Sequence, residues 1–395
     1  MEWKTVKLGD ILKITGGQLY KGDLLGTGDN LLLGMGCVSF LEKFLMKGAR
    51  QYGGDCLDKN IGRPGDIVLA TRQQSDNLPI LAMPAIIPEG LPAKKIIIGS
   101  NLYKVNVTDP DFNSRFIYWL LKTPEYVNYI SSVKTGTTVK MITIKDVESY
   151  TFLCPPKESR DKISKFLWDL DDKIENNNRI NANLEAQAKA LFKSWFIDFE
   201  PFGGSVPNDW KEGTLEDICT QLKEKVGNRD DVKVLSPVTT GKLMLSEEYF
   251  IKQVFSQSIE KYIVVPPTAF AYNPARVNIG SLGMNEFDFD GCVSPVYVVF
   301  ECKEGYEYFF DLFRRTNQFK EEVKSRAIGG VRQTLGYDDF KRIQTVIPPK
   351  EIVDEFNKIY TAMLDVSDAN KRENQRLAAL RDSLLPKLMR GEIAL

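Results

Sequence analysis

The stretch Pro155-Pro156-Lys157-Glu158 opens a segment that continues to Glu200 with the pattern of one long helix. Prolines suit the first turn of a helix, because the N–H groups they lack would have no intrahelical partner there. From Ile163 onward a seam recurs at alternating steps of four and three residues, the heptad spacing of a coiled coil. The seam residues are Ile163, Leu167, Leu170, Ile174, Asn177, Asn181, Leu184, Ala188, Leu191 and Trp195. At about 1.5 Å per residue the helix spans on the order of 60 Å, and its narrow apolar stripe requires a partner helix.

A matching segment begins 193 residues later, at Pro348-Pro349-Lys350-Glu351. Without a gap, the corresponding seam residues are Phe356, Tyr360, Met363, Ser367, Asn370, Asn374, Leu377, Arg381, Leu384 and Leu388. Arg381 is the one clear exception to an apolar seam, and we expect it to extend outward to solvent along its aliphatic stem. This segment is the predicted partner of the first helix.

Both seams carry asparagine at the same repeat positions, since Asn177 and Asn181 fall on Asn370 and Asn374. A buried Asn costs a coiled coil stability but fixes its register and orientation. Both pairs lie near the midpoints of their helices, so an antiparallel pair would bring the four amides into one central layer. The alternative is two independent helices with Asn on solvated faces; the shared period, opening and Asn placement favour the coiled coil.

The composition is that of a globular protein of two or three domains, with 395 residues, 43% hydrophobic and 27% charged. Lys and Arg number 52 against 53 Asp and Glu, so any nucleic-acid surface must be local. No run of about 18 apolar residues predicts a membrane span, and Met1-Glu2-Trp3-Lys4 does not resemble a signal peptide, which predicts a cytoplasmic protein. Six cysteines lack metal-site spacing and are interpreted as buried or free thiols in a reducing compartment.

The chain contains no histidine. This excludes Ser-His and Cys-His nucleophile pairs, His-ligated zinc and an imidazole base. Gly241-Lys242 lacks the upstream glycine of a P-loop, and no GxGxxG opens a helix. Each Pro-Pro pair is followed by Lys or Thr and not by the aromatic residue of an amino-methyltransferase motif. We therefore expect a binding protein without a metal site, not an enzyme.

Residues 1–154 and 201–347 flank the first long helix and have the same plan. Trp3 and Leu8-Gly9-Asp10-Ile11 are echoed by Trp210 and Leu215-Glu216-Asp217-Ile218. The first domain has predicted strands at 67–70, 96–98, 102–107 and 150–154 and a helix at 113–129; the second has strands at 269–272 and 293–300 and a helix at 306–324. The sequence thus predicts an α+β tandem duplication with pseudo-two-fold symmetry, in which domains 1–154 and 201–347 are separated by antiparallel helices at 155–200 and 348–395.

Two similar domains on a rigid helix pair could recognise two half-sites about 34–36 Å apart on one face of B-DNA. The domains differ in sequence, so the target would be asymmetric and bipartite. At the level of motifs, the chain resembles the specificity subunit of type I restriction-modification enzymes over essentially its full length. The motifs are the two Pro-Pro-Lys-Glu openings, ALFKSWFIDF at 190–199, LLPKLMRGEI at 384–393, YNPAR at 272–276 and GCVSPVYVVF at 291–300. The family usually has Gln shortly after each Pro-Pro; here Arg160 and Val353 stand there, at what we interpret as a structural contact.

The resemblance implies a non-catalytic protein that binds double-stranded DNA. It implies docking of two adenine methyltransferase subunits and two ATP-dependent restriction-translocase subunits. S-adenosylmethionine, ATP and Mg²⁺ would belong to those partners, with no cofactor in this chain. The competing hypothesis is a coiled-coil scaffold whose globular heads bind proteins. An enzyme active by itself is disfavoured by the missing motifs.

Base edges are matched by Arg to guanine and by Asn or Gln to adenine, while Lys, Ser and Thr mostly contact phosphates. The candidate DNA contacts of the first domain are Arg72, Gln73, Gln74, Ser75, Asn77, Thr137, Thr138 and Lys140. Those of the second are Asn273, Arg276, Asn278, Ser281, Arg332, Gln333 and Thr334. Residues 137–140 and 332–334 follow glycine at one repeat position, where close approach to a partner is possible. Solvated loops and simple turns are the alternatives.

The end of the first helix carries more aromatic surface than one seam requires. The residues are Leu191, Phe192, Trp195, Phe196 and Phe199. One interpretation is that they dock methyltransferase subunits, because aromatic residues are enriched in interface cores. The other is that they close the end of the coiled coil against a recognition domain, and both can hold for different residues.

Overall fold

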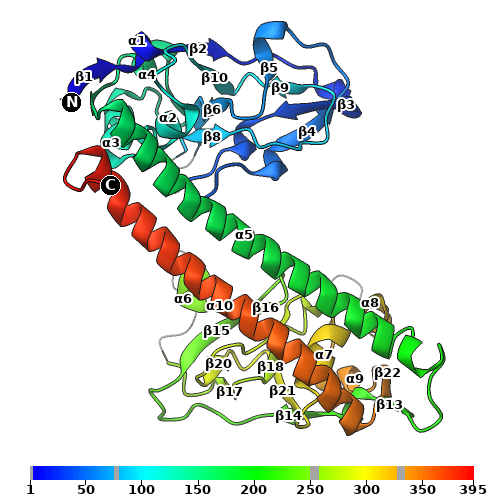
Figure 1. The fold of residues 1–395 in the computed structure, drawn as a ribbon. Coiled ribbons are helices and arrows are strands. Elements are labelled where there is room, and N and C mark those ends of the chain that lie inside the picture. Colours follow the sequence, from blue (N-terminus) through cyan, green and yellow to red (C-terminus); the bar gives the residue numbers. More distant parts are fainter. Residues whose placement is uncertain (1–2, 75–79, 250–257, 327–333) are drawn as a thin grey trace. The chain divides into compact units, whose positions relative to one another are not determined.

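The computed structural model describes residues 3–74, 80–249, 258–326 and 334–395. It forms two compact units: unit 1 comprises residues 1–178 and 371–395, and unit 2 comprises residues 179–370 (Figure 1). The long helices α5 (Lys157–Phe196) and α10 (Lys350–Met389) each contribute one part to each unit. Both helices begin directly after their Pro-Pro pairs, as the openings predict, and end at Phe196 and Met389, before the predicted limits of 200 and 395.

Unit 1 contains two four-stranded sheets, drawn in blue and cyan in Figure 1. The antiparallel one has the order β2 (Leu12–Gly16), β10 (Leu102–Val107), β6 (Ile67–Ala70), β8 (Pro84–Ile86). The mixed one has the order β4 (Ala49–Tyr52), β3 (Leu25–Leu33), β9 (Ile96–Ile98), β5 (Ile61–Gly62), with β3 and β9 parallel. The pair β1 (Lys4–Lys7) and β12 (Thr151–Cys154) joins the start of the unit, where α1 (Leu8–Ile11) follows, to the chain entering α5.

Unit 2 repeats this topology strand for strand. Its antiparallel sheet has the order β14 (Cys219–Leu222), β21 (Val298–Cys302), β18 (Phe270–Tyr272), β19 (Leu282–Met284). Its mixed sheet has the order β16 (Lys242–Leu245), β15 (Lys233–Val238), β20 (Gly291–Val293), β17 (Ile263–Val265), with β15 and β20 parallel. The pair β13 (Lys211–Thr214) and β22 (Gln344–Ile347) corresponds to β1 and β12. The predicted tandem duplication is therefore confirmed.

Helices of the second repeat begin 193 residues after those of the first. The pairs are α2 (Ser114–Leu120) and α7 (Glu307–Phe313), α3 (Pro124–Val133) and α8 (Asn317–Arg326), α4 (Ile144–Glu148) and α9 (Tyr337–Phe340), and α5 and α10. The 193-residue repeat, which the sequence shows for the long helices, thus reaches back to α2. One further short helix, α6 (Ser246–Tyr249), lies only in unit 2 among the described residues.

Three elements that the sequence predicts as continuous are each interrupted in the structure. The helices predicted at 113–129 and 306–324 are each two helices, broken at Thr123 and Thr316. Pro124 disfavours helical geometry at Thr123, and both threonine hydroxyls cap the next helix, accepting from Tyr126 N at 3.3 Å and from Phe319 N at 3.2 Å. The strand predicted at 293–300 is β20 and β21, interrupted at Pro295, which has no N–H to donate to a sheet.

The antiparallel pairing of the long helices is present within each unit. In unit 1, the Asn177 amide donates to Asn374 Oδ1 at 2.9 Å and to Glu373 at 2.7 Å. In unit 2, the Asn370 amide donates to Asn181 Oδ1 at 2.9 Å. Every residue of both predicted seams is buried or half-buried, so the heptad pattern marks the contact faces of both helices.

Arg381 does not extend to solvent, contrary to our expectation. Its side chain is 6% exposed, and its guanidinium donates to Asp171 Oδ1 at 2.5 Å. Asp171 is itself buried, on the facing turn of α5. The buried carboxylate supplies the opposite charge that makes an inward arginine tolerable, since a lone buried guanidinium would be strongly unfavourable.

The six cysteine thiols are all free. Among the described residues, no helix combines the length and hydrophobicity that a bilayer crossing requires. The same residues contain no group of three or more side chains suited to hold a metal ion.

Candidate nucleic-acid interface

In unit 1 the two predicted contact segments lie side by side. Strand β7 (Arg72–Gln73) pairs antiparallel with β11 (Lys140–Met141), and Ile142 N donates to Thr71 O at 3.3 Å. The turn before β11 uses Gly136 at φ +91°, where a Cβ atom would approach Val139 O to 2.1 Å, so only glycine fits. The loop that follows β6 and the turn that precedes α4 thus form one surface.

The side chains on this surface are not equivalent. Arg72, Gln74, Thr137 and Thr138 are exposed, and Lys140 is half-buried. Gln73 is buried, and its amide oxygen accepts a hydrogen bond from Leu81 N at 3.2 Å. The structure therefore gives Gln73 a role in shaping the loop and argues against direct base contact. Ser75 and Asn77 lie outside the described residues.

Unit 2 has the same junction with different side chains. Leu335 N donates to Pro274 O at 3.1 Å, which corresponds to the bond between Ile142 and Thr71 because Leu335 lies 193 residues after Ile142. This bond holds Thr334, which is exposed, beside the 273–281 loop. Arg332 and Gln333 lie outside the described residues.

The 273–281 loop contains two structural and two exposed polar side chains. Asn273 Oδ1 accepts from Ala275 N at 3.0 Å and so shapes the turn. Ser281 is 1% exposed and donates to Pro237 O at 2.7 Å, which argues against a base contact. Arg276 and Asn278 are the predicted contacts of this loop whose side chains are exposed.

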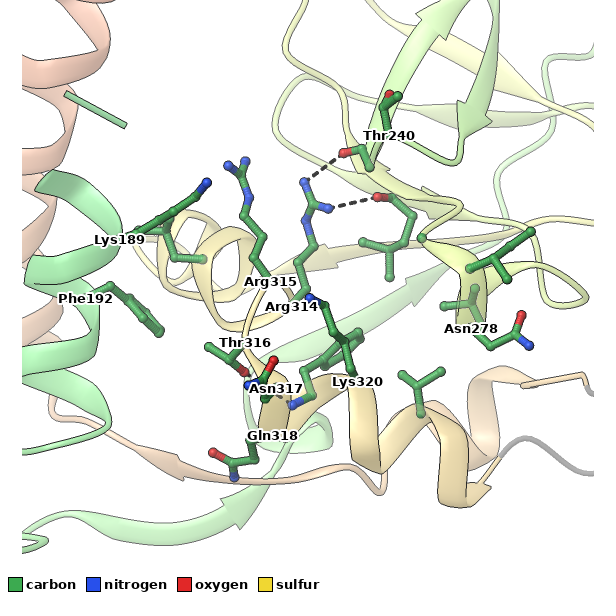
Figure 2. A pocket seen from close by; sticks show the side chains of 18 of the residues that line it. Lys189, Phe192, Thr240, Asn278, Arg314, Arg315, Thr316, Asn317, Gln318 and Lys320 are labelled. Carbon is green, nitrogen blue, oxygen red and sulfur yellow. Dashed lines mark hydrogen bonds between the residues drawn. The ribbon is translucent and has the colours of Figure 1, made fainter. Parts of the chain in front are cut away.

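Sequence reasoning did not find a basic groove in unit 2, with a volume of about 980 Å³ (Figure 2). Its walls are the second part of α5, the turn between β15 and β16, the 3₁₀ helix η7 (Val277–Ile279) and the junction of α7 and α8. Its basic residues are Lys189, Lys193, Lys242, Arg314, Arg315 and Lys320. Glu185 is the one carboxylate lining the groove among the described residues, and the hydrogen bond from Lys189 lowers its pKa. Of the predicted contacts that the structure describes, only Asn278 lines this groove.

Arg314 holds two walls of the groove together. Its guanidinium donates to Gly241 O at 3.0 Å and to Leu282 O at 2.9 Å, bonds that Figure 2 draws as dashed lines. It also pairs at 2.5 Å with Asp311, which is buried. Arg314 is therefore part of the scaffold of the groove, while the ends of the other basic side chains surround the space.

Comparison with known proteins relates the chain to DNA specificity subunits. Residues 1–186 match the model of the type I restriction modification DNA specificity domain. The MjaIX specificity subunit of Methanocaldococcus jannaschii is 26% identical over 311 residues, covering 71% of this chain and 69% of that protein. The HindI specificity subunit of Haemophilus influenzae is 27% identical over 370 residues, covering 73% and 80%. By these matches the chain is similar to type I restriction-modification specificity subunits. Its fold is similar to that of the S subunit from M. genitalium, with a TM-score of 0.60, 16% identity and coverage of 98% and 96%.

The residues that replace the usual Gln of the specificity-subunit family have structural contacts. Arg160 is buried, donates to Pro155 O at 2.8 Å and stacks over the Phe112 ring at 4.0 Å. Val353 is completely buried in the core of unit 2. Both substitutions therefore affect packing next to the helix starts.

The aromatic end of α5, a further family motif, packs inside unit 2. Phe192 and Phe196 are buried against Phe309 and Phe356, with ring centroids 5.1 to 6.0 Å apart. Leu191, Trp195 and Phe199 are half-buried. The interpretation that this segment closes the coiled coil against a recognition domain describes Phe192 and Phe196. Docking of a methyltransferase subunit on the half-buried residues stays a prediction.

Proposed function

We propose that this specificity subunit reads an asymmetric bipartite DNA target, with one half-site per unit. The observation that carries the proposal is the duplicated junction. The same backbone bond, from Ile142 to Thr71 in unit 1 and from Leu335 to Pro274 in unit 2, supports different exposed side chains. Unit 1 presents Arg72 and Gln74.

The side chains that unit 2 presents at its junction are Arg276 and Asn278. A shared frame with different donors and acceptors suits two half-sites of different sequence, because Arg matches guanine and Asn or Gln matches adenine.

The catalytic steps would belong to partner subunits. Two adenine methyltransferase subunits would bring S-adenosylmethionine, and two restriction-translocase subunits would bring ATP and Mg²⁺. This chain would position them on the sequence that it reads. The missing histidine and missing phosphate-binding motifs support that division of work.

Methylome sequencing tests the proposal in cells that express this chain with its neighbouring methyltransferase. We expect a methyl-adenine motif of two unlike halves around a fixed gap. Arg72→Ala should relax one half and Arg276→Ala the other, because each removes a side chain worth about 1 to 3 kcal/mol of base discrimination. If an assembled, active methyltransferase complex yields no motif, the scaffold hypothesis replaces this one.

A further inference from the structure

The groove in unit 2 is continuous with the loop that presents Arg276 and Asn278. Asn278 and Ile279 of η7 line it directly, and η7 packs against α8. A molecule that occupied the groove would therefore lie beside the residues proposed to read the second half-site. This inference rests on the proposed function and extends it to the DNA backbone.

Two of the lysines in the groove are available for a ligand. Lys242 and Lys320 are exposed, and neither has an ion pair among the described residues. By contrast, Lys189 pairs with Glu185 at 2.7 Å and Arg315 pairs with Asp311 at 2.5 Å. These two lysines come from separate elements, β16 and α8.

The uncharged lining also has the chemistry of phosphate contacts. Thr239 and Thr240 occupy the turn between β15 and β16, and Asn317 and Gln318 are exposed at the start of α8. Hydroxyl and amide donors of this kind, together with Lys and Arg, make most protein contacts to DNA phosphates. Acidic proteins would be attracted by the same charges, but an interface core for a protein is depleted in lysine.

Unit 1 lacks this chemistry at the corresponding positions. The groove residues Lys189, Lys193, Arg314, Gln318 and Lys320 correspond, 193 residues away, to Asp382, Pro386, Leu121, Glu125 and Val127. Arg315 corresponds to Lys122, whose ammonium is buried and donates to the Tyr118 hydroxyl at 2.9 Å. The basic groove is therefore a property of unit 2 and not of the shared fold.

We propose that this groove binds backbone phosphates of the duplex next to the second half-site, with Lys242 and Lys320 as the main charged contacts. The two units then divide the work unequally. Both units read bases, while unit 2 also attracts the DNA phosphates electrostatically, independently of the base sequence.

The test measures salt-dependent DNA binding by the chain assembled with its methyltransferase. The variant is Lys242→Gln with Lys320→Gln, and the matched control is Lys261→Gln with Lys303→Gln, two exposed lysines of unit 2 outside the groove. Removing one lysine that neutralises a phosphate should reduce the slope of log K against log salt by about 0.9. We expect a total reduction of about 2 for the groove variant, equal on cognate and non-cognate duplexes, with the methylated motif unchanged and no change in the control.

The possible results distinguish failure of the groove proposal from failure of the proposed function. If the wild-type complex binds cognate duplex specifically and the groove variant retains its salt slope, the groove proposal fails and the proposed function stands. If the wild-type complex shows no preference for any motif, the proposed function fails. If the groove variant instead loses its methyltransferase, as seen by mass measurement of the complex, the groove is a protein-docking surface and the phosphate proposal is overturned.

Discussion

At the scale of single residues, the buried pair of Arg381 and Asp171 is what most distinguishes the helix seam of unit 1. Both side chains are nearly inaccessible, and Asp171 Oδ2 has no hydrogen-bond partner among the residues that the structure describes. At the corresponding positions of unit 2 stand Ala188 and Leu364, which are apolar. The helix pair therefore carries an ion pair at this position in unit 1 and two apolar side chains in unit 2.

Arg381→Ala should lower the free energy of unfolding by about 3 to 5 kcal/mol, because it leaves the Asp171 carboxylate buried and unpaired. The double variant Asp171→Leu with Arg381→Ala copies unit 2 and should recover most of that loss. Urea unfolding of the three proteins measures the difference. If the single and double variants prove equally unstable, the cost comes from lost packing and not from an unpaired charge.

Lys122 predicts a pH dependence of stability. Burial lowers the pKa of its ammonium from 10.5 to about 8. Between pH 8 and pH 10.5 the unfolded chain binds a proton that the folded chain lacks, so Lys122 makes the free energy of unfolding rise with pH. Below pH 8 the ammonium is charged in both states, and the full cost of burying it is present. Because a shift of one pKa unit corresponds to 1.36 kcal/mol, burial of the Lys122 ammonium lowers the free energy of unfolding by about 3 kcal/mol. Lys122→Met removes this cost, so the stability of this variant relative to wild type should be highest at pH 8 and decline toward pH 10.5. The free energies of unfolding are measured by denaturant titration. A difference between Lys122→Met and wild type that is the same at every pH from 8 to 10.5 would contradict the prediction.

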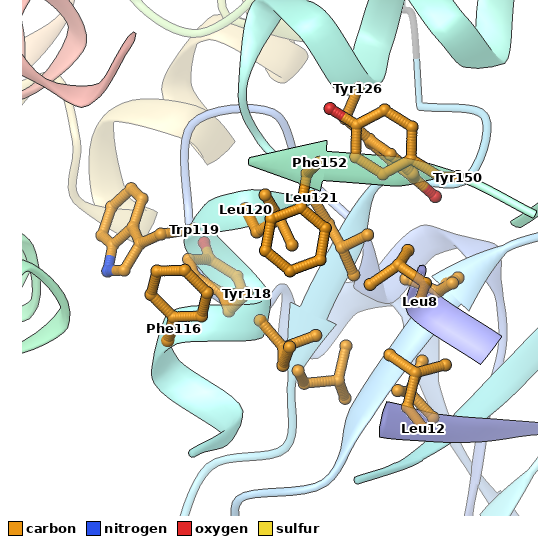
Figure 3. Packing of buried hydrophobic residues seen from close by; sticks show 14 of the residues in the cluster. Leu8, Leu12, Phe116, Tyr118, Trp119, Leu120, Leu121, Tyr126, Tyr150 and Phe152 are labelled. Carbon is orange, nitrogen blue, oxygen red and sulfur yellow. The ribbon is translucent and has the colours of Figure 1, made fainter. Parts of the chain in front are cut away.

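At the scale of elements, a threonine cap separates two helices in each unit. In unit 1, α2 directs Phe116 and Leu120 into the core beside Phe152 (Figure 3). Thr123 then ends this helix, with its hydroxyl donating to Leu120 O at 2.7 Å and accepting from Tyr126 N. The break redirects the chain so that Tyr126 of α3 reaches the same core.

Thr123→Val should destabilise the chain by about 1 to 2 kcal/mol, because it removes the N-cap and leaves the N–H of the buried Tyr126 without its partner. Thr123→Ser keeps the hydroxyl and is the matched control. Thermal unfolding of both variants against wild type gives the comparison. If Thr123→Val is no less stable than Thr123→Ser, the hydroxyl cap does not account for the stability of this segment.

The elements that could be predicted from sequence are those encoded locally. The heptad seam, the Pro-Pro helix starts and the strand at 67–70 each follow from a short pattern, and they are present. Gln73 and Ser281 look like loop readers in the sequence, but they are buried because tertiary neighbours, Leu81 N and Pro237 O, complete their hydrogen bonds. The groove could not be predicted from the sequence because its basic residues come from three segments that lie far apart in the chain.

At the scale of the whole molecule, the duplicated units do not end where the sheets end. The core of unit 1 includes Ile163 and Leu167 of α5 together with Leu385 and Leu388 of α10. A recognition domain defined as residues 1–154 therefore depends on both long helices for part of its interior. An exchange of recognition domains should succeed only when the incoming core fits these helix residues.

Replacing residues 1–154 by the corresponding segment of the HindI specificity subunit should change one half of the methylated motif and leave the other half unchanged. The reason is that the second set of candidate contacts, with Arg276 and Asn278, lies entirely in unit 2. The reciprocal exchange of residues 201–347 is the control and should change only the other half. Methylome sequencing of both chimaeras measures the outcome. If one exchange alters both halves while the chimaera still assembles with its methyltransferase, base recognition is not divided between the units, because the side chains of one unit then influence the sequence read by the other.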